Sequence, residues 1–295
     1  MVDLFPGFST RQLEVEPGSM IHARVGGAGP PLLLLHGFPQ THVIWHQVAR
    51  RLAESFTVVA ADLRGYGDSF KPPSAPDHAP HSKRAMARDQ VRTMELLGFD
   101  SFHLVGHDRG GRVAHRLALD HPHRVRTVAV LDIAPTLHMY RRTDLAFARA
   151  YYHWFFLIQP EPMPERLIGA EAELYLRWTL GRGAAGLKPF ADDALAEYIR
   201  CFRDPRAIHA TCEDYRASAG IDLLHDEADL GKKVAAPLLV LWGKKGVVEA
   251  CFDALAAWRE RADSVTGRAL DCGHYLPEEE PEAVADEIVK HCGAR

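Results

Sequence analysis

The sequence predicts an α/β protein built on a doubly wound, mostly parallel sheet. Short apolar runs recur along the chain at residues 32–35, 57–60, 102–105, 127–131 and 238–242. Runs of this kind are typical of parallel strands that are buried on both faces. Helical patterns lie between several of the runs or follow the last one, at residues 44–53, 85–97, 111–119 and 282–291. Alternation of strands with helices is the pattern of α/β folds.

Two further segments complete the predicted architecture. Residues 8–23 read as an antiparallel hairpin around Pro17-Gly18-Ser19, which makes 32–35 the third strand. From about residue 135 to 229 the alternation breaks, and aromatic residues sit in mostly helical sequence. We therefore expect a core domain of residues 1–134 and 230–295, with a helical cap of residues 135–229 inserted after the sixth strand. Such a cap would cover the carboxyl ends of the strands, where open α/β sheets bind ligands.

Composition excludes several classes of protein. The 295 residues are 47% hydrophobic and 25% charged, which is ordinary globular usage. The net charge is −4 and there is no block of Lys or Arg, so a nucleic-acid partner is not expected. No apolar run approaches the roughly 18 residues of a membrane helix, and the first residues lack the pattern of a secretory signal. We expect a cytoplasmic protein whose ligand is a small molecule.

No cofactor or metal is expected either. The 5 cysteines have no CxxC spacing, which suits neither a zinc site nor a disulfide framework. His42 and His46 have the i, i+4 spacing of a zinc helix but lack the Glu of HExxH. Gly26-Gly-Ala-Gly29 precedes a strand instead of following one, so it is not a dinucleotide loop.

The chemistry is concentrated first in Gly106-His107-Asp108-Arg109-Gly110, between a predicted strand and a helix. This is the G-x-nucleophile-x-G spacing of a nucleophile elbow, although Asp108 alone would also serve as an ordinary helix cap. The segment His36-Gly37-Phe38-Pro39 follows the strand at 32–35. With these two motifs, nearly the whole chain resembles the α/β-hydrolase superfamily, in which the second segment is the oxyanion loop.

An aspartate as nucleophile selects the reaction. Attack of a carboxylate on an ester gives a reactive anhydride, whereas displacement at saturated carbon gives a stable alkyl ester. At a helix N-terminus Asp108 should be ionised at neutral pH. The ester must then be hydrolysed by a water that a general base activates.

The other two members of a catalytic triad follow from position. Asp271-Cys-Gly-His274 resembles the superfamily's catalytic histidine loop, so His274 is the expected base. No carboxylate directly follows the strand at 238–242, where many relatives carry the acid. Asp132, directly after the strand at 127–131, is therefore expected to orient His274, with capping of the next segment as the alternative. Backbone amides of Phe38 and Arg109 are the expected oxyanion hole.

Two further groups describe the substrate. Arg109 and Arg112 stand one and four residues after the nucleophile, and paired guanidinium groups fit a carboxylate. His153, Trp154 and Tyr215 offer donors without negative charge, which suits a halide. From spacing alone the arginines are indistinguishable from solvated residues and the aromatics from core residues.

Taken together, the motifs resemble the haloacetate (fluoroacetate) dehalogenase family, in which an aspartate, two arginines, a His-Trp pair and a tyrosine recur in these roles. The resemblance implies hydrolysis of 2-haloacetates to glycolate and halide through an aspartyl ester. It leaves the preferred halide and the substrate length open. Relatives of this kind are often dimers, so a homodimer is an expectation.

Three alternatives remain at this point. An epoxide hydrolase shares the nucleophile and base and uses two cap tyrosines, for which Tyr152 and Tyr215 are the candidates. A haloalkane dehalogenase would prefer an apolar wall to Arg109. A receptor for a small acid would bind without turnover.

Overall fold

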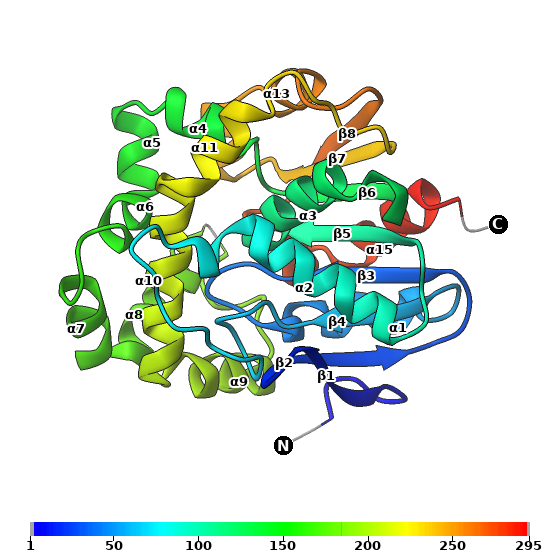
Figure 1. Ribbon diagram of the computed structural model, residues 1–295, viewed down its shortest axis with the longest axis horizontal. Coiled ribbons are helices and arrows are strands. Elements are labelled where there is room, and N and C mark those ends of the chain that lie inside the picture. Colours follow the sequence, from blue (N-terminus) through cyan, green and yellow to red (C-terminus); the bar gives the residue numbers. More distant parts are fainter. Residues whose placement is uncertain (1–2, 184, 294–295) are drawn as a thin grey trace.

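The computed structural model describes residues 3–183 and 185–293. Its centre is an eight-stranded sheet in the order β1-β2-β4-β3-β5-β6-β7-β8 (Figure 1). The first two strands run antiparallel to their neighbours and the remaining pairs are parallel. The strands are β1 (Ser9–Glu16), β2 (Ser19–Gly26), β3 (Pro31–Leu35), β4 (Thr57–Ala61), β5 (Phe102–His107), β6 (Val125–Leu131), β7 (Leu238–Gly243) and β8 (Val265–Leu270).

The predicted strands are present, and their burial explains why the sequence revealed them. Every residue of β3 and β5 is buried, because helices cover both faces of the sheet. The hairpin β1–β2 turns at Pro17-Gly18, with Gly18 at φ 77°, and β2 continues the sheet by pairing Ala23 with Ala61. The fold class expected from the sequence is confirmed.

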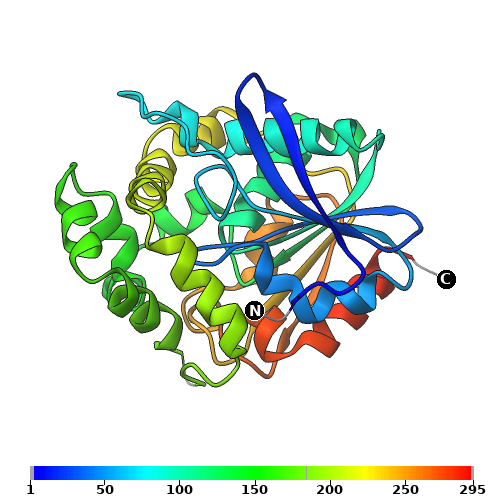
Figure 2. The same cartoon turned by 90° about the horizontal axis from the view of Figure 1, so that it is seen from below.

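The helices of the core form a layer on each side of the sheet (Figure 2). One layer holds α2 (Lys83–Leu96) against α3 (Arg109–Asp120), and the other holds α1 (His46–Leu52) against α15 (Pro281–His291). The 3₁₀ helices η1 (His42–Trp45), η2 (Ala79–His81) and η3 (Pro122–Arg124) lie in the connections. Beside β7 and β8 are α12 (Val247–Cys251), α13 (Ala254–Arg259) and α14 (Leu276–Glu279).

All eight helices described between β6 and β7 are gathered at one end of the sheet (Figure 1). They are α4 (Thr136–Arg141), α5 (Leu145–Ala150), α6 (Tyr152–Leu157), α7 (Met163–Ala170), α8 (Ala172–Gly181), α9 (Asp192–Phe202), α10 (Pro205–Ala219) and α11 (Ile221–Ala228). This is the helical insertion that the sequence predicted after the sixth strand. Its division from the core as a domain of residues 135–229 stays a prediction.

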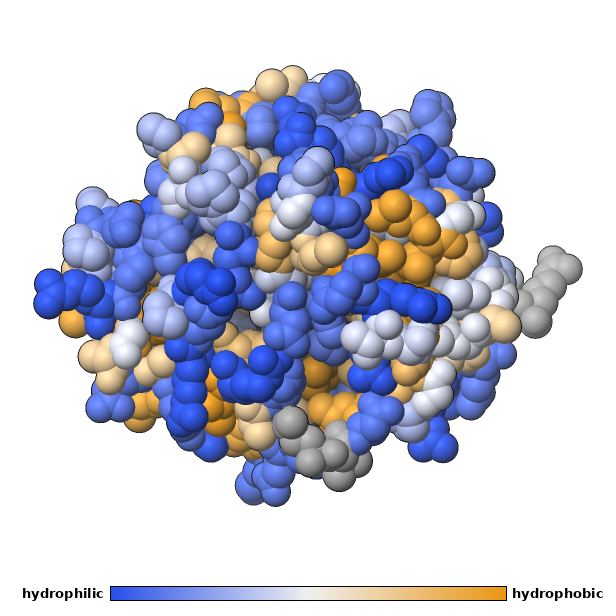
Figure 3. Space-filling model, turned by 60° about the horizontal axis from the view of Figure 1, so that its bottom comes forward, coloured by the Kyte–Doolittle hydropathy of each residue, from blue (hydrophilic) through white to orange (hydrophobic). Residues whose placement is uncertain are grey.

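On the face drawn in Figure 3, hydrophilic residues are in the majority and hydrophobic residues form smaller groups. Among the described residues, the large apolar side chains that are more than 60% exposed all belong to the inserted helices: Leu145, Leu167, Leu174, Trp178 and Leu224. The homodimer stays a prediction. None of the helices described combines the length and the apolar character needed to cross a membrane.

Candidate active site

Asp108 stands at a sharp turn between β5 and α3. Its backbone adopts φ 46° and ψ −113°, a strained conformation for a residue with a side chain. The flanking glycines make the turn possible. A Cβ on Gly106 would lie 2.3 Å from the carbonyl oxygen of Gly110, and one on Gly110 would lie 2.4 Å from that of Leu35. The structure therefore has the nucleophile elbow that the motif predicted.

The carboxylate of Asp108 is buried but surrounded by groups that favour its charge. Its Oδ1 accepts a hydrogen bond of 3.0 Å from the backbone amide of Phe38. Burial raises the pKa of Asp108, but His274, Arg112 and Arg109 outweigh burial and lower it to about 2. Asp108 is thus ionised at neutral pH, with Oδ1 held by the oxyanion loop.

His274 and Asp132 form the expected pair. Nδ1 of His274 lies 2.6 Å from Oδ2 of Asp132, while Oδ1 of Asp132 accepts a bond of 2.9 Å from the amide of Gly243. Gly243, the last residue of β7, thus supplies a backbone donor that fixes the carboxylate of Asp132. Burial lowers the pKa of His274, but the hydrogen bond and charge of Asp132, together with Asp108, raise it above its ordinary value. Asp132 is not the N-cap of the next helix, α4, because Pro135 occupies that position.

Arg109 is completely buried and points toward α10. Its Nε and Nη2 donate to the carboxylate of Asp214 at 2.8 Å each, and Nη2 also donates to Ser218 Oγ at 2.6 Å. The guanidinium lies 4.1 Å from the ring centre of Tyr215. Its remaining nitrogen, Nη1, has no hydrogen-bond partner among the described residues. The protein thus fixes Nε and Nη2 of the guanidinium, and Nη1 is the donor that a ligand could use.

Arg112 is arranged in a similar way one helical turn later. Its Nη1 donates to Thr136 Oγ1 at 2.9 Å and its guanidinium lies 4.6 Å from the ring of Trp154. Its Nε is buried without a hydrogen-bond partner among the described residues. The two arginines predicted to bind a carboxylate are therefore each stacked on an aromatic residue of the predicted halide group.

The three predicted halide-binding residues do come together. His153 stacks on Phe38 with ring centres 5.9 Å apart, and its ring meets that of Tyr215 edge-on at 5.8 Å. Nε1 of Trp154 and the hydroxyl of Tyr215 are buried with no hydrogen-bond partner among the described residues. Burial raises the pKa of Tyr215 well above its usual range and lowers that of His153 well below it. At neutral pH both side chains are therefore uncharged.

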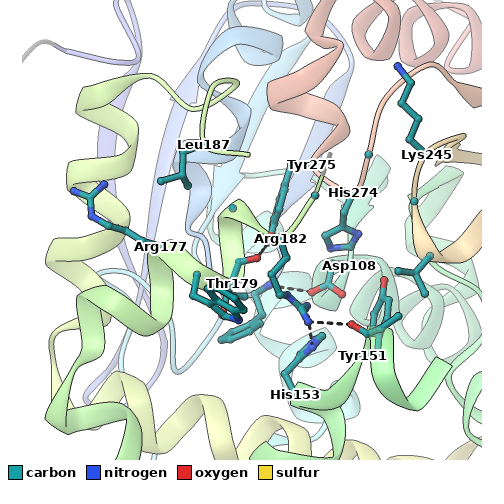
Figure 4. Close-up of a pocket in the computed structure, with 18 of the residues that line it drawn as sticks. Asp108, Tyr151, His153, Arg177, Thr179, Arg182, Leu187, Lys245, His274 and Tyr275 are labelled. Carbon is teal, nitrogen blue, oxygen red and sulfur yellow. Dashed lines mark hydrogen bonds between the residues drawn. The ribbon is translucent and has the colours of Figure 1, made fainter. Parts of the chain in front are cut away.

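A cavity of about 810 Å³ opens onto Asp108 (Figure 4). Among its lining residues are Phe38, Tyr151, His153, Tyr215, His274 and Tyr275. Arg109, Arg112 and Trp154 are buried and are not among the residues that line it. Binding of a carboxylate by Arg109 and Arg112 therefore stays a prediction.

The match of the chain to a known family covers the elements that position Asp108, Asp132 and His274. The family model of the alpha/beta hydrolase fold matches residues 30–281. The chain belongs to this family. The match includes the oxyanion loop, the elbow, the inserted helices and the histidine loop, so the superfamily resemblance inferred from the motifs is confirmed.

Relatives of this hydrolase include enzymes of two kinds. The chain is 49% identical to the fluoroacetate dehalogenase of Burkholderia sp. over 283 residues, which are 96% of this chain and 93% of the relative. It is 36% identical to the soluble epoxide hydrolase of Corynebacterium sp. (strain C12) over 280 residues, which are 92% and 93% of the two chains. The resemblance to haloacetate dehalogenases is thereby confirmed as a relationship of sequence.

Solved structures agree with the fold throughout the chain. One described as an alpha/beta hydrolase from Nostoc sp. PCC 7120 has a TM-score of 0.95 at 58% identity and covers 96% of this chain and 97% of its own. Another, described as an epoxide hydrolase from Pseudomonas aeruginosa, has a TM-score of 0.90 at 45% identity and covers 98% and 97%. The hydrolase thus shares its whole architecture with proteins of both descriptions.

Several residues of the site escaped the sequence analysis. Tyr152, the candidate for an epoxide-binding pair, does not line the cavity, whereas its neighbour Tyr151 does. Asp214 directly precedes Tyr215 in sequence, but nothing local indicated that it binds Arg109. Arg182 also lines the cavity and had no motif to mark it.

One cluster of the described residues has the side chains of a metal site, namely His22, His42 and Asp62, whose ligand atoms lie within 4.8 Å of one another. Hydrogen bonds account for this arrangement. Asp62 Oδ1 accepts from the amide of His42 at 2.7 Å and lies 2.9 Å from its Nδ1, and Nδ1 of His22 lies 3.0 Å from Nε2 of Gln12. Asp62 also accepts a bond of 3.0 Å from the amide of Asp68, so it organises the loop between these two residues.

Proposed function

We propose that this hydrolase is a haloacetate dehalogenase, which converts a 2-haloacetate and water to glycolate and halide. The observation that carries the proposal is a set of buried donors, on side chains close to Asp108, that have no hydrogen-bond partner in the described part of the chain. They are Nη1 of Arg109, Nε of Arg112, Nε1 of Trp154 and the hydroxyl of Tyr215. Buried polar groups are normally hydrogen-bonded, so donors left over beside a nucleophile indicate a ligand with several acceptor sites.

The charges of these donors indicate that the ligand has two chemically different ends. Arg109 and Arg112 are cationic and suit a carboxylate, which a neutral epoxide or alkyl halide lacks. Trp154 and Tyr215 are neutral donors and suit a halide as its negative charge develops. A 2-haloacetate has both ends two bonds apart, and its C2 lies between them.

The first chemical step forms an ester. Oδ1 of Asp108 is held by the amide of Phe38, so Oδ2 is the oxygen that attacks C2. As the new C–O bond forms, the C–halogen bond breaks and the halide leaves with the electron pair toward Trp154 and Tyr215. Holding the carboxylate fixes the angle of attack, and desolvated donors stabilise the departing charge.

The second step returns the enzyme to its starting state. His274 takes a proton from water, and the hydroxide attacks the ester carbon of Asp108. Negative charge then develops on Oδ1, beside the amide of Phe38, and we assign the amide of Arg109 as the second donor. Asp132 stabilises the protonated His274. When the tetrahedral intermediate collapses, the bond between the ester carbon and Oδ2 breaks, and the departing glycolate oxygen takes the proton from His274. The carboxylic acid left on Asp108 then loses its proton to solvent, which restores the carboxylate.

The decisive experiment is fluoride release from fluoroacetate, with chloroacetate and a neutral epoxide assayed in parallel. The Asp108→Asn variant is the control for the nucleophile. A single turnover in water labelled with oxygen-18 should place the label in Asp108 before it appears in glycolate. Turnover of the epoxide alone would refute the proposal.

An epoxide hydrolase is the second candidate, because Tyr151 and Tyr215 both line the cavity beside Asp108. Two phenols of this kind would donate to an epoxide oxygen. The Arg112→Met variant separates the two functions: it should abolish haloacetate turnover but leave an epoxide reaction within a few-fold. A haloalkane dehalogenase would respond as the epoxide hydrolase does.

A further inference from the structure

Arg182 connects the inserted helices at the cavity. It directly follows α8 and lines the cavity together with His153. Its Nη1 donates to the carbonyl oxygen of Ala150 at 3.0 Å, and its Nη2 lies 3.2 Å from Nδ1 of His153. Its guanidinium also lies 5.2 Å from the ring centre of Tyr152. Figure 4 shows Arg182 reaching across the cavity to His153.

The contact between Arg182 and His153 determines where the imidazole carries its proton. A guanidinium has only donors, so Nδ1 of His153 must be the acceptor. A neutral imidazole with a lone pair on Nδ1 has its proton on Nε2. Burial, and next to it the positive charge of Arg182, lower the pKa of His153 well below its usual value, so the ring is neutral. The other tautomer would bring two N–H donors face to face at 3.2 Å.

We propose that Arg182 is a positioning residue that fixes His153 as the Nε2–H tautomer, so that this nitrogen donates a hydrogen bond to the departing halide. The halide role rests on the proposed function, whereas the tautomer rests only on the contact itself. Nδ1 is the only atom of the His153 ring for which a hydrogen bond is found among the described residues, which leaves Nε2 for a ligand. With the opposite tautomer, Nε2 would present a lone pair to the halide and repel it.

The choice of leaving group should depend on this donor. Fluoride is small and strongly hydrated, so it needs hydrogen-bond donors more than chloride does. Removal of one donor that meets developing charge costs an enzyme about 10²–10³-fold in rate. Loss of the fixed tautomer should therefore slow fluoroacetate more than chloroacetate and lower the ratio of their kcat/KM values by about tenfold.

Three variants test the proposal. Arg182→Met has a similar length but no donor, and Arg182→Lys restores a donor and the charge. Arg177→Met is the matched control, because Arg177 is a cavity-lining arginine of α8 that binds Glu173 at 2.8 Å and points away from His153 (Figure 4).

The first measurement is the nitrogen-15 NMR spectrum of the histidine rings, with the His153 signals assigned by their loss in His153→Gln. We expect Nε2–H with an unprotonated Nδ1 in the wild type and in Arg177→Met, and a mixture of tautomers in Arg182→Met. A wild-type ring protonated on Nδ1, or an Arg182→Met spectrum unchanged from wild type, would overturn the positioning role. This measurement needs no turnover.

The second measurement is the fluoroacetate to chloroacetate ratio of kcat/KM. It should fall about tenfold in Arg182→Met, recover to within a few-fold of wild type in Arg182→Lys, and stay unchanged in Arg177→Met. An equal loss for both substrates would indicate a merely structural role and overturn the proposal. If the wild type turns over neither haloacetate, the proposed function and the halide role fail together, and the NMR result still decides the tautomer.

Discussion

The guanidinium of Arg109 and the carboxylate of Asp214 form a bidentate pair in the interior of the protein, with two hydrogen bonds of 2.8 Å. Neither side chain is exposed. Lys83 binds the same carboxylate, so one negative charge lies between two positive ones. Burial raises the pKa of Asp214, but Arg109 and Lys83 hold it well below its usual range. The pair fixes the orientation of the Arg109 guanidinium.

Replacing Asp214 by Asn should weaken both stability and substrate binding. Removal of one partner from a buried pair typically costs about 3–5 kcal/mol, since the remaining cations stay uncompensated. The KM for a haloacetate should rise about tenfold, more than kcat falls, because Arg109 loses its orientation. Thermal melts and steady-state kinetics measure the two effects.

Ser218→Ala is the milder companion of that variant. It removes the 2.6 Å bond from Arg109 and the long 3.5 Å bond to Asp222, so the protein should remain folded while KM rises a few-fold. An unchanged KM in both variants would mean that Arg109 does not bind the substrate.

The Asp132→Asn variant should separate the two chemical steps. Ester formation does not use His274, so halide should be released once per active site in a burst. Hydrolysis of the ester should then be slower by about 10⁴-fold, as when an amide replaces the carboxylate behind a catalytic histidine. Rapid-quench halide assays and the intact mass of the protein should reveal the trapped ester. Normal steady-state turnover would contradict the role of Asp132.

The pKa of His274 predicts opposite pH dependences for activity and stability. His274 acts as a base only when unprotonated, so turnover should be lost as the pH falls through a pKa that is raised above 6.5. The halide burst should persist there, because the pKa of Asp108 is about 2. The raised pKa stabilises the fold below pH 6.5, and this contribution is lost as the pH rises through the folded-state value.

Both pH dependences can be measured on the same samples. Steady-state rates and unfolding free energies are measured between pH 5 and pH 9. The pH midpoints of the two profiles should shift together in Asp132→Asn, which lacks the charge that raises the pKa of His274. A pH limb of turnover at or below pH 6.5 in the wild type would contradict the assignment.

The sequence was informative where local burial or a local turn determines structure. The leucines of β3 are fully buried, and such a run stands out in any window. The strand β8 escaped notice because exposed and partly buried residues alternate along it, as at a sheet edge. Asp108 was found because its turn requires glycines at fixed spacing, which is a purely local demand.

The remaining parts of the site depend on contacts between distant segments. Asp214 lies 105 residues from Arg109, and Arg182 lies 29 residues from His153. The helix α6 has only 6 residues and follows a non-helical Tyr151, so no helical period shows which of its side chains face Asp108. In the structure His153 lines the cavity, whereas Tyr152, the candidate named for the epoxide hydrolase alternative, does not.

Glu278 makes a prediction that is independent of the reaction. Its carboxyl group is buried between the core and the inserted helices, where Oε1 accepts from the hydroxyl of Tyr198 at 2.5 Å and from Nε2 of Gln40 at 3.3 Å. Burial raises the pKa of Glu278 to about 8, although the bond from Tyr198 opposes the shift. The group is therefore protonated in the folded protein at neutral pH.

A raised carboxyl pKa makes the fold less stable as the pH increases. Above the ordinary value of 4.5 the unfolded chain loses this proton while the folded chain retains it, until the pH passes about 8. Each pKa unit between the two states corresponds to about 1.4 kcal/mol. Glu278→Gln keeps the shape of the neutral acid and has no proton to lose, so its stability relative to wild type should rise from pH 5 to pH 8. Urea unfolding at the two pH values measures this difference, with Glu280→Gln as the neighbouring control. A difference between Glu278→Gln and wild type that is the same at both pH values would mean that Glu278 is ionised in the folded protein, and that Tyr198 and Gln40 bind a carboxylate.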